Sequence, residues 1–193
     1  MPLIHGFDPP ERFVTGTVGP PGSRTFFLQA RAGLRMTSVS LEKQQVAALA
    51  ERIDQLLDEV MANGDNDAIV PAVMPVGLED SHPLEQPIEE EFRAGTMTLS
   101  WDSADERVVI EVFPFDESAV AGTEPADEAL DEPEPDEVLL VRIDAGTARA
   151  FVKRSTQVIG AGRPNCPFCG NPVDPEGHLC ARANGFRRRD PTV

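Results

Sequence analysis

Alternating apolar and polar residues divide the first part of the chain into short strands. Phe13 to Thr17 could form one strand, and the composition of residues 25–31 (TFFLQAR) favours a second. A turn at Ala32-Gly33 leads into a third strand that ends near Leu41. This pattern predicts antiparallel strands joined by tight turns.

The strongest helical pattern follows directly and runs from Leu41 to about Met61. Ser40 is placed to cap the start of this helix, and Asn63-Gly64 is a stop signal. The apolar residues that recur at helical spacing are Val46, Leu49, Ile53, Leu56, Leu57 and Val60.

The second half of the chain repeats this order. Residues 96–101 (TMTLSW) alternate as in a half-buried strand, and residues 107–113 (RVVIEVF) return after a turn. Residues 137–143 (EVLLVRI) form a nearly continuous apolar strand that we expect to be central in its sheet. Asp144 can cap a last helix that runs to about Ile159.

These patterns predict an α+β fold: an antiparallel sheet from two strand–strand–helix halves, with the helices on one face and a small C-terminal zinc knuckle. We expect an α+β domain over residues 1–161, with a pseudo-repeat of residues 13–63 and 95–161. The zinc knuckle and a basic tail occupy residues 162–193. The two halves share only the order of their elements, because no residue-level identity links them.

Charge is distributed unevenly along the chain, whose formal net charge is −16. Residues 79–91 contain six acids and residues 116–137 contain ten, with no Lys or Arg in either segment. The remaining 17 acids balance the 17 Lys and Arg residues. Both segments also contain prolines, so we expect extended, solvated loops, the second an acidic insertion between two strands. Such loops could recruit a basic partner, and they disfavour binding to nucleic acid.

All three cysteines lie in one short stretch, CPFCGNPVDPEGHLC, together with one of the three histidines. Cys166 and Cys169 flank a tight turn, and His178 and Cys180 are two residues apart, so both side chains of an extended segment point the same way. A four-ligand set of three cysteines and one histidine is typical of structural Zn²⁺. With no position left open for water, we expect the zinc to be structural and not catalytic.

Two other uses of these cysteines remain open. Cys166 and Cys169 could form a redox pair, although such a pair normally opens a helix and here prolines follow it. A disulfide framework fits a cytoplasmic protein poorly, and three cysteines leave one over. The cysteines could also have no role.

A run of three arginines, Arg187, Arg188 and Arg189, follows the knuckle. A zinc knuckle with a basic tail and an aromatic such as Phe168 or Phe186 is a combination that nucleic-acid binders use. Three arginines are a small patch on an acidic chain, so nucleic acid remains the weaker alternative. The tail could equally contact a protein partner or remain solvated.

Catalytic motifs are absent: there is no G-x-S-x-G, no P-loop and no H-E-x-x-H. His5 and His82 remain as general bases, and both occupy positions typical of solvent-exposed histidines. An enzyme that acts on a phosphorylated metabolite through carboxylates and arginines of the N-terminal loop is the main alternative function. Its residues would be Asp8, Glu11, Arg12 and Arg24.

Three stretches together resemble an actinobacterial family defined as a domain of unknown function, number thirty-ninety. They are residues 7–30 (FDPPERFVTGTVGPPGSRTFFLQA), residues 40–60 (SLEKQQVAALAERIDQLLDEV) and residues 162–185 (GRPNCPFCGNPVDPEGHLCARANG). The four knuckle residues match the family pattern. The resemblance also implies genes beside those of a kinase-like and a phosphatase-like protein, an association that indicates partners and no chemistry.

From the sequence we therefore expect a non-catalytic, zinc-binding interaction protein. The absence of a signal peptide and of a long apolar run predicts a cytoplasmic protein that does not bind membranes. We expect a protein partner, with a kinase-like and a phosphatase-like protein as candidates. It would contact the knuckle, the acidic loops and Arg187 to Arg189.

Overall fold

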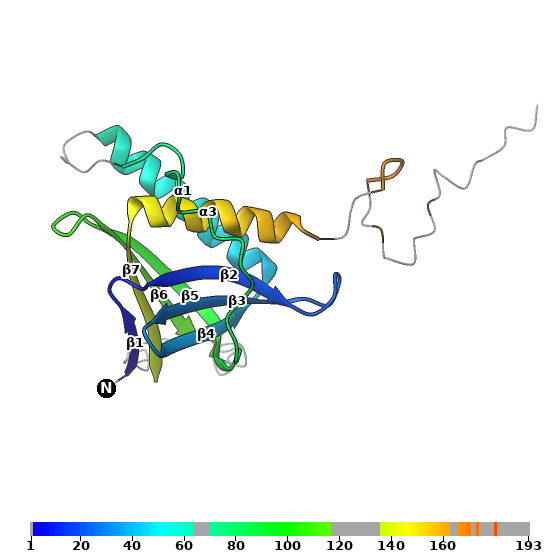
Figure 1. The fold of residues 1–193 in the computed structure, drawn as a ribbon, viewed down its shortest axis with the longest axis horizontal. Coiled ribbons are helices and arrows are strands. Elements are labelled where there is room, and N and C mark those ends of the chain that lie inside the picture. The colour runs from blue at the N-terminus through cyan, green and yellow to red at the C-terminus, as the bar shows by residue number, and fades with distance from the viewer. Residues whose placement is uncertain are drawn as a thin grey trace, which may run out of the picture.

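The computed structural model of the chain describes residues 2–63, 70–116, 136–162, 166–170, 173 and 180. The body is a seven-stranded sheet with two helices packed on it (Figure 1). Its elements in chain order are β1 (Leu3–Phe7), β2 (Arg12–Val18), β3 (Thr25–Ala32), β4 (Arg35–Leu41), α1 (Lys43–Asn63), β5 (Glu90–Asp102), β6 (Arg107–Pro114), β7 (Glu137–Asp144) and α3 (Ala145–Gly160).

The sheet is mixed, which corrects the antiparallel sheet expected from the sequence. Its strand order is β1-β7-β6-β5-β4-β3-β2, with parallel pairs at β1–β7 and β4–β5. Helix α1 connects β4 to β5, and a connection through a helix brings the chain back to the same end of the sheet, as a parallel pair requires. The two halves are therefore joined side by side in one sheet. The α+β class is confirmed.

Strand β1 was missed because residues 3–7 are few and lie near two prolines. This strand pairs with β7, at the other end of the chain, with Leu3 opposite Glu137. As a result β7 lies one strand in from an edge and not at the centre of the sheet. Its apolar character still fits an interior position, because β7 is paired on both edges, with β1 and β6, and most of its residues are buried or half-buried.

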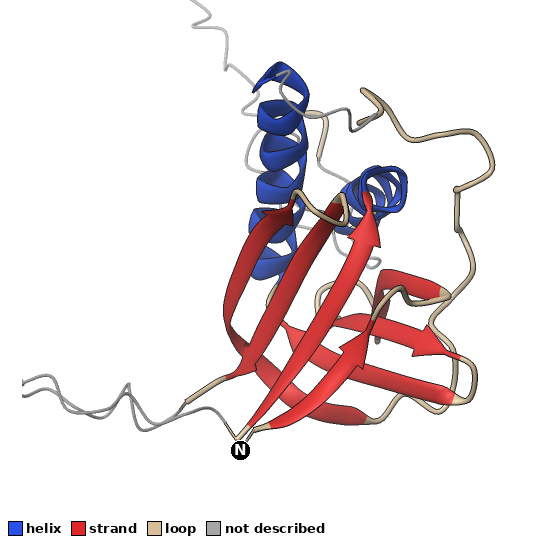
Figure 2. Ribbon diagram, turned by 90° about the vertical axis from the view of Figure 1, so that its left-hand side faces the viewer, coloured by secondary structure: helices blue, strands red, loops and turns tan. Residues whose placement is uncertain are grey.

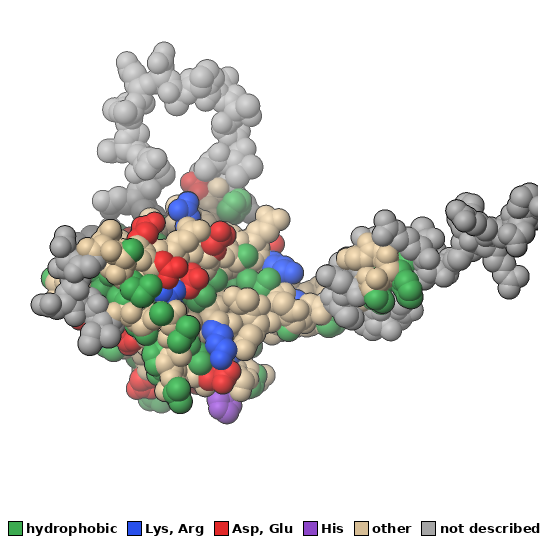
Figure 3. All heavy atoms as spheres, turned by 90° about the horizontal axis from the view of Figure 1, so that it is seen from above, with side chains coloured by type: hydrophobic (Ala, Val, Ile, Leu, Met, Phe, Trp, Pro, Cys, Tyr) green, Lys and Arg blue, Asp and Glu red, His purple; other side chains and the backbone are tan. Residues whose placement is uncertain are grey.

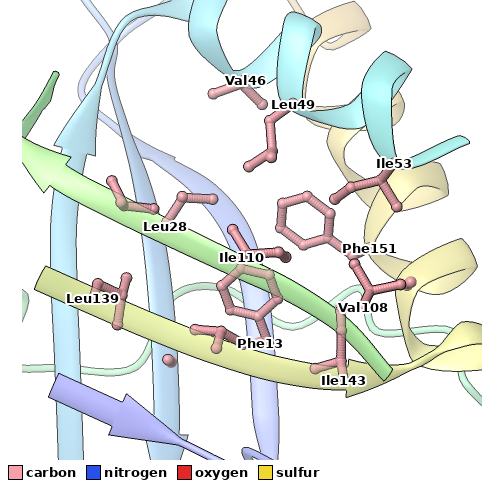
Figure 4. Packing of buried hydrophobic residues seen from close by; sticks show 14 of the residues in the cluster. Phe13, Leu28, Val46, Leu49, Ile53, Val108, Ile110, Leu139, Ile143 and Phe151 are labelled. Carbon is pink, nitrogen blue, oxygen red and sulfur yellow. The ribbon is translucent and has the colours of Figure 1, made fainter. Parts of the chain in front are cut away.

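Both helices lie on the same side of the sheet, and one continuous core fills the space between the layers (Figures 2 and 4). Val46, Leu49 and Ile53 of α1 face Val108 and Ile110 of β6 in this core, as the helical spacing predicts. Phe13 of β2 stacks on Phe151 of α3, with ring centroids 4.6 Å apart.

Two expected helix signals agree with the structure and one does not. The Asp144 side chain accepts a hydrogen bond from the Thr147 backbone N–H, so it caps α3 as predicted, and α1 ends at Asn63. Ser40, by contrast, belongs to β4, and the Gln45 side chain instead accepts from the Glu42 N–H at the start of α1. Strand pairing with β3 occupies Ser40, so the cap moves along the chain.

The sheet curls strongly, as Figure 2 shows. Arg35, at the start of β4, donates a hydrogen bond to the carbonyl oxygen of Gly6 in β1 and lies over the Phe7 ring. Strands that are far apart in the sheet order therefore meet at one end of the body. This curling decides which side chains of β1, β5 and β7 come together.

The first acidic segment, residues 79–91, is largely exposed, as expected, but the side chains of Leu84 and Asp80 also dock it on the body. Leu84 is buried against Val14 and Phe27 on the face of the sheet opposite the helices. A side chain at Gly16 would collide with Leu84, because a Cβ there would lie 2.4 Å from its Cγ. The second acidic segment lies outside the described residues except at its ends.

Candidate metal centre

Cys166, Cys169 and Cys180 come together in the structure, as the sequence predicts. Their sulfur atoms all lie within 4.8 Å of one another, and the Cys166 and Cys180 sulfurs are 3.7 Å apart. Cys166 and Cys180 are buried although neither belongs to the core cluster of the body. No disulfide joins the three cysteines, all of which are among the described residues. We call these three residues the cysteine cluster.

A tight turn of the backbone positions the first two sulfurs. The Gly170 N–H donates a hydrogen bond to the Cys166 carbonyl oxygen at 2.8 Å, which closes the turn around residues 167–169. Gly170 has a φ of 76°, a conformation that favours glycine over any other residue. The sequence CPFCG therefore folds locally into the knuckle shape that its spacing predicts.

The turn also favours the thiolate form of Cys166. Burial raises the pKa of this thiol, but hydrogen bonds from the backbone N–H groups of Cys169 and Phe168 lower the pKa. Together with the neighbouring thiols of Cys169 and Cys180, these hydrogen bonds leave the pKa of Cys166 below its usual value. The thiolate is the form that binds metal.

The three sulfurs are arranged so that they could hold a metal ion. A zinc–sulfur bond of about 2.3 Å at tetrahedral angles separates two ligand sulfurs by about 3.8 Å. The observed separation of 3.7 Å between Cys166 and Cys180 agrees with this value. The donor set and its spacing therefore fit a soft divalent metal.

The other residues predicted around this centre lie outside the described residues. They are His178, the proposed fourth ligand, and the basic run Arg187, Arg188 and Arg189. Phe168, between the first two cysteines, is described, and its side chain is 61% exposed.

The four N-terminal residues of the alternative enzyme hypothesis do not converge on one pocket. Instead each has its own partner on the body. Asp8 pairs with Arg142, Glu11 with Arg31, Arg12 with Asp80, and Arg24 donates to the carbonyl oxygens of Val158 and Ala161.

A groove of about 330 Å³ does lie beside two of these residues, Glu11 and Arg12, and Arg154 also lines it. Both arginines bind Asp80, with Arg12 Nε 2.6 Å and Arg154 Nη1 3.0 Å from its carboxylate oxygens. The hydrogen bond from Arg12 holds the pKa of Asp80 below its usual value. Arg154, 10% exposed, also donates to the carbonyl oxygens of Thr15 and His82. We call Arg12, Arg154 and Asp80 the arginine lock, because they fasten the segment after residue 79 to β2 and α3.

The structure also brings together three side chains that the sequence analysis did not connect: His5, Glu91 and Glu137. His5 was expected to be solvent-exposed, but its side chain is only 14% exposed. Residues 3–7 (LIHGF) do not alternate between apolar and polar residues, so β1 carries only a weak sequence signal. No sequence signal links His5 to glutamates that lie far along the chain.

Within the described part of the chain, no helix is long and apolar enough to span a membrane. No curated protein and no solved structure showed a significant match to this chain. A family model described as a protein of unknown function, DUF3090, matches residues 5–180 and so spans both the body and the cysteine cluster. Because this match covers most of the chain, the protein belongs to the DUF3090 family.

Proposed function

We propose that this protein is a non-catalytic, zinc-binding interaction protein of the cytoplasm, and that its C-terminal knuckle docks a protein partner. The observation that carries the proposal is the cysteine cluster, three sulfurs spaced as zinc ligands around a tight turn. In the proposed centre Cys166, Cys169, Cys180 and His178 bind one Zn²⁺. Four protein ligands close the coordination shell, so the metal shapes the backbone and leaves no position for a substrate.

The described part of the knuckle supports a docking role. Phe168 is exposed at the tip of a turn whose two ends are the metal ligands Cys166 and Cys169. A metal-pinned aromatic loses little conformational entropy on binding, and exposed aromatics of this kind are common anchors of protein interfaces. The proposed partner therefore offers an apolar pocket for Phe168 and, because the tail carries Arg187 to Arg189, acidic residues beside the pocket.

The arginine lock makes an enzyme acting on a phosphorylated metabolite the less favoured function. A phosphate site needs guanidinium N–H groups that can donate to the phosphate oxygens. Arg12 and Arg154 already donate to Asp80 and to backbone carbonyls. On the helix face of the body, the acidic and basic side chains of the described residues are interspersed, and these residues form no single-sign patch suited to nucleic acid there (Figure 3).

Capture of the tagged, full-length protein from its own cytosol tests the proposal. We expect a stoichiometric protein partner, with kinase-like and phosphatase-like proteins as the first candidates. Phe168→Ala should weaken this partner's binding by at least tenfold while zinc content stays unchanged. Leu34→Ala is the matched control, because Leu34 is fully exposed at the β3–β4 turn on the body.

Two results would contradict the docking role. The first is a partner that binds the natural chain, the Phe168→Ala variant and the Cys166→Ser/Cys169→Ser variant with equal affinity. The second is co-purifying nucleic acid whose binding falls steeply with salt, which would favour the nucleic-acid alternative.

A further inference from the structure

Three strands bring His5, Glu91 and Glu137 together at one end of the curled sheet. His5 lies on β1 and Glu137 on the neighbouring strand β7, where the parallel register places both on the same side. Glu91 comes from β5, which is not a neighbour of β1 in the sheet order. The His5 ring also approaches the ring of buried Phe92, with 6.4 Å between centroids. We call these three residues the imidazole–carboxylate cluster.

The distances within this cluster fit a single small ion. His5 Nε2 lies 3.1 Å from Glu137 Oε2 and 4.0 Å from Glu91 Oε1, and all three ligand atoms lie within 4.8 Å of one another. Metal–nitrogen and metal–oxygen bonds of about 2.0–2.2 Å at tetrahedral angles place neighbouring ligand atoms about 3.3–3.6 Å apart. Rotation of the glutamate side chains, which are 44% and 23% exposed, covers the remaining difference.

The negative charges of Glu91 and Glu137 are not paired with an arginine or lysine of the described residues. Elsewhere in the body, carboxylates such as Asp80, Asp102 and Asp54 each pair with an arginine. Among the described residues, neither Glu91 nor Glu137 lies within 4.0 Å of a Lys or Arg nitrogen; their shared partner is the His5 ring. Two carboxylates held near each other without a cation favour the binding of a positive ion.

The ligand types narrow the class of ion. Imidazole nitrogen suits first-row transition metals, whereas Mg²⁺ and Ca²⁺ prefer oxygen ligands alone. Three protein ligands leave at least one coordination position for water or an anionic group. The partly exposed glutamates leave the cluster accessible from solvent.

We propose that His5, Glu91 and Glu137 form a second metal site, which binds a divalent transition-metal ion such as Zn²⁺ or Mn²⁺ through Nε2 and one oxygen of each carboxylate. The site differs from the cysteine cluster in chemistry, because it contains no sulfur and keeps open coordination positions. It is independent of the docking role proposed above.

Metal titration of the full-length protein tests this site after the cysteine cluster has been filled with Zn²⁺. We expect Co²⁺ to occupy one further position per chain without a sulfur-to-cobalt charge-transfer band. Glu91→Gln/Glu137→Gln should weaken the binding of this second metal ion by more than about 100-fold. Loss of a residue that only supports a metal ligand typically weakens metal binding by less than this. Glu89→Gln is the matched control, since it changes the charge of a nearby exposed residue that is not in the cluster.

A second measurement needs no variant of the cluster. Mn²⁺ should broaden the imidazole resonances of His5 in the NMR spectrum, while the exposed His82 serves as an internal reference. The proposal is overturned if the zinc-filled protein binds no further metal, or if His5 and His82 broaden equally. It is also overturned if the Glu91→Gln/Glu137→Gln variant, shown to be folded by its thermal unfolding, retains the second metal.

Discussion

The cysteine cluster and the imidazole–carboxylate cluster each place three nitrogen, oxygen or sulfur atoms that could hold a metal ion within 4.8 Å of one another, but by different means. The three cysteines lie within residues 166–180, and a local turn positions two of them. His5, Glu91 and Glu137 come from three strands that only the curled sheet brings together. A local cluster depends on its own short segment, whereas a cluster built by the sheet depends on the whole core. The two should therefore respond to different changes.

Removing the cysteine ligands should have the largest effect and should leave the body intact. Cys166→Ser/Cys169→Ser removes two thiolates from the proposed zinc centre, and a zinc ion bound there would contribute on the order of 10 kcal/mol to local folding. We expect the variant to lose zinc and its C-terminal segment to become sensitive to protease, with the thermal midpoint of the body unchanged. Zinc content by mass spectrometry and limited proteolysis measure these effects. Full zinc retention would contradict the metal assignment.

A cavity in the core should destabilise the body and leave the cysteine cluster intact. Phe151→Ala removes a buried ring stacked on Phe13 and should lower the free energy of unfolding by about 3–5 kcal/mol. Metal binding at the cysteine cluster should survive, because its turn does not depend on this core. Binding at the imidazole–carboxylate cluster should weaken when the body begins to unfold. Urea unfolding followed by metal analysis checks both, with exposed Leu34→Ala as the control.

Breaking the arginine lock tests how strongly the segment after residue 79 is held on the sheet. Arg154→Met leaves the Thr15 and His82 carbonyls without this donor and should cost about 3 kcal/mol. Lys153→Met, one residue away, breaks only an exposed pair with Glu79 and should cost less than about 1 kcal/mol. Urea unfolding compares the two variants, and amide hydrogen exchange should show faster exchange near Leu84 in the first. Equal stability of both variants would contradict a structural role for the lock.

Acid should weaken the arginine lock in a defined pH range. The pKa of Asp80 is lowered mainly by its hydrogen bond from Arg12, so the folded state binds fewer protons there than the unfolded chain. Its stabilising contribution is complete above the unfolded pKa, near 3.8, and is lost as the pH falls through the lowered value. Asp80→Asn should flatten the acid side of the stability curve, measured as unfolding midpoint against pH. An unchanged slope would show that other carboxylates dominate this range.

The elements with local signals were predicted well. The turn expected at Ala32-Gly33 lies one residue later, at Gly33-Leu34, and joins β3 to β4. Asp144 caps α3, and the helical spacing of α1 identifies the face that packs in the core. In each case residues close in the sequence determine the result, through a positive φ, a capping carboxylate or one face of a helix. The cysteine cluster belongs to the same class, because its three cysteines lie within residues 166–180 and a turn of five residues positions two of them.

The misjudged elements are those whose partners lie far along the chain. The segment at residues 79–91 is acidic and contains prolines, yet Arg12 and Arg154 neutralise Asp80, and Val14 and Phe27 bury Leu84. The composition of a segment does not show which residues from elsewhere in the chain pack against it. The same reason explains why the antiparallel sheet was wrong, since the parallel pairs join strands from different halves of the chain.

By itself, therefore, the sequence determined the α+β class, the order of the strands and helices after β1, and the three-cysteine centre, because short-range patterns encode all three. Only the tertiary structure decided the mixed strand order, the docking of residues 79–91 and the meeting of His5 with Glu91 and Glu137. These features arise when the sheet curls and residues far apart in sequence pack together. No local pattern of hydrophobic and polar residues records such contacts, because they depend on the shape of the whole core.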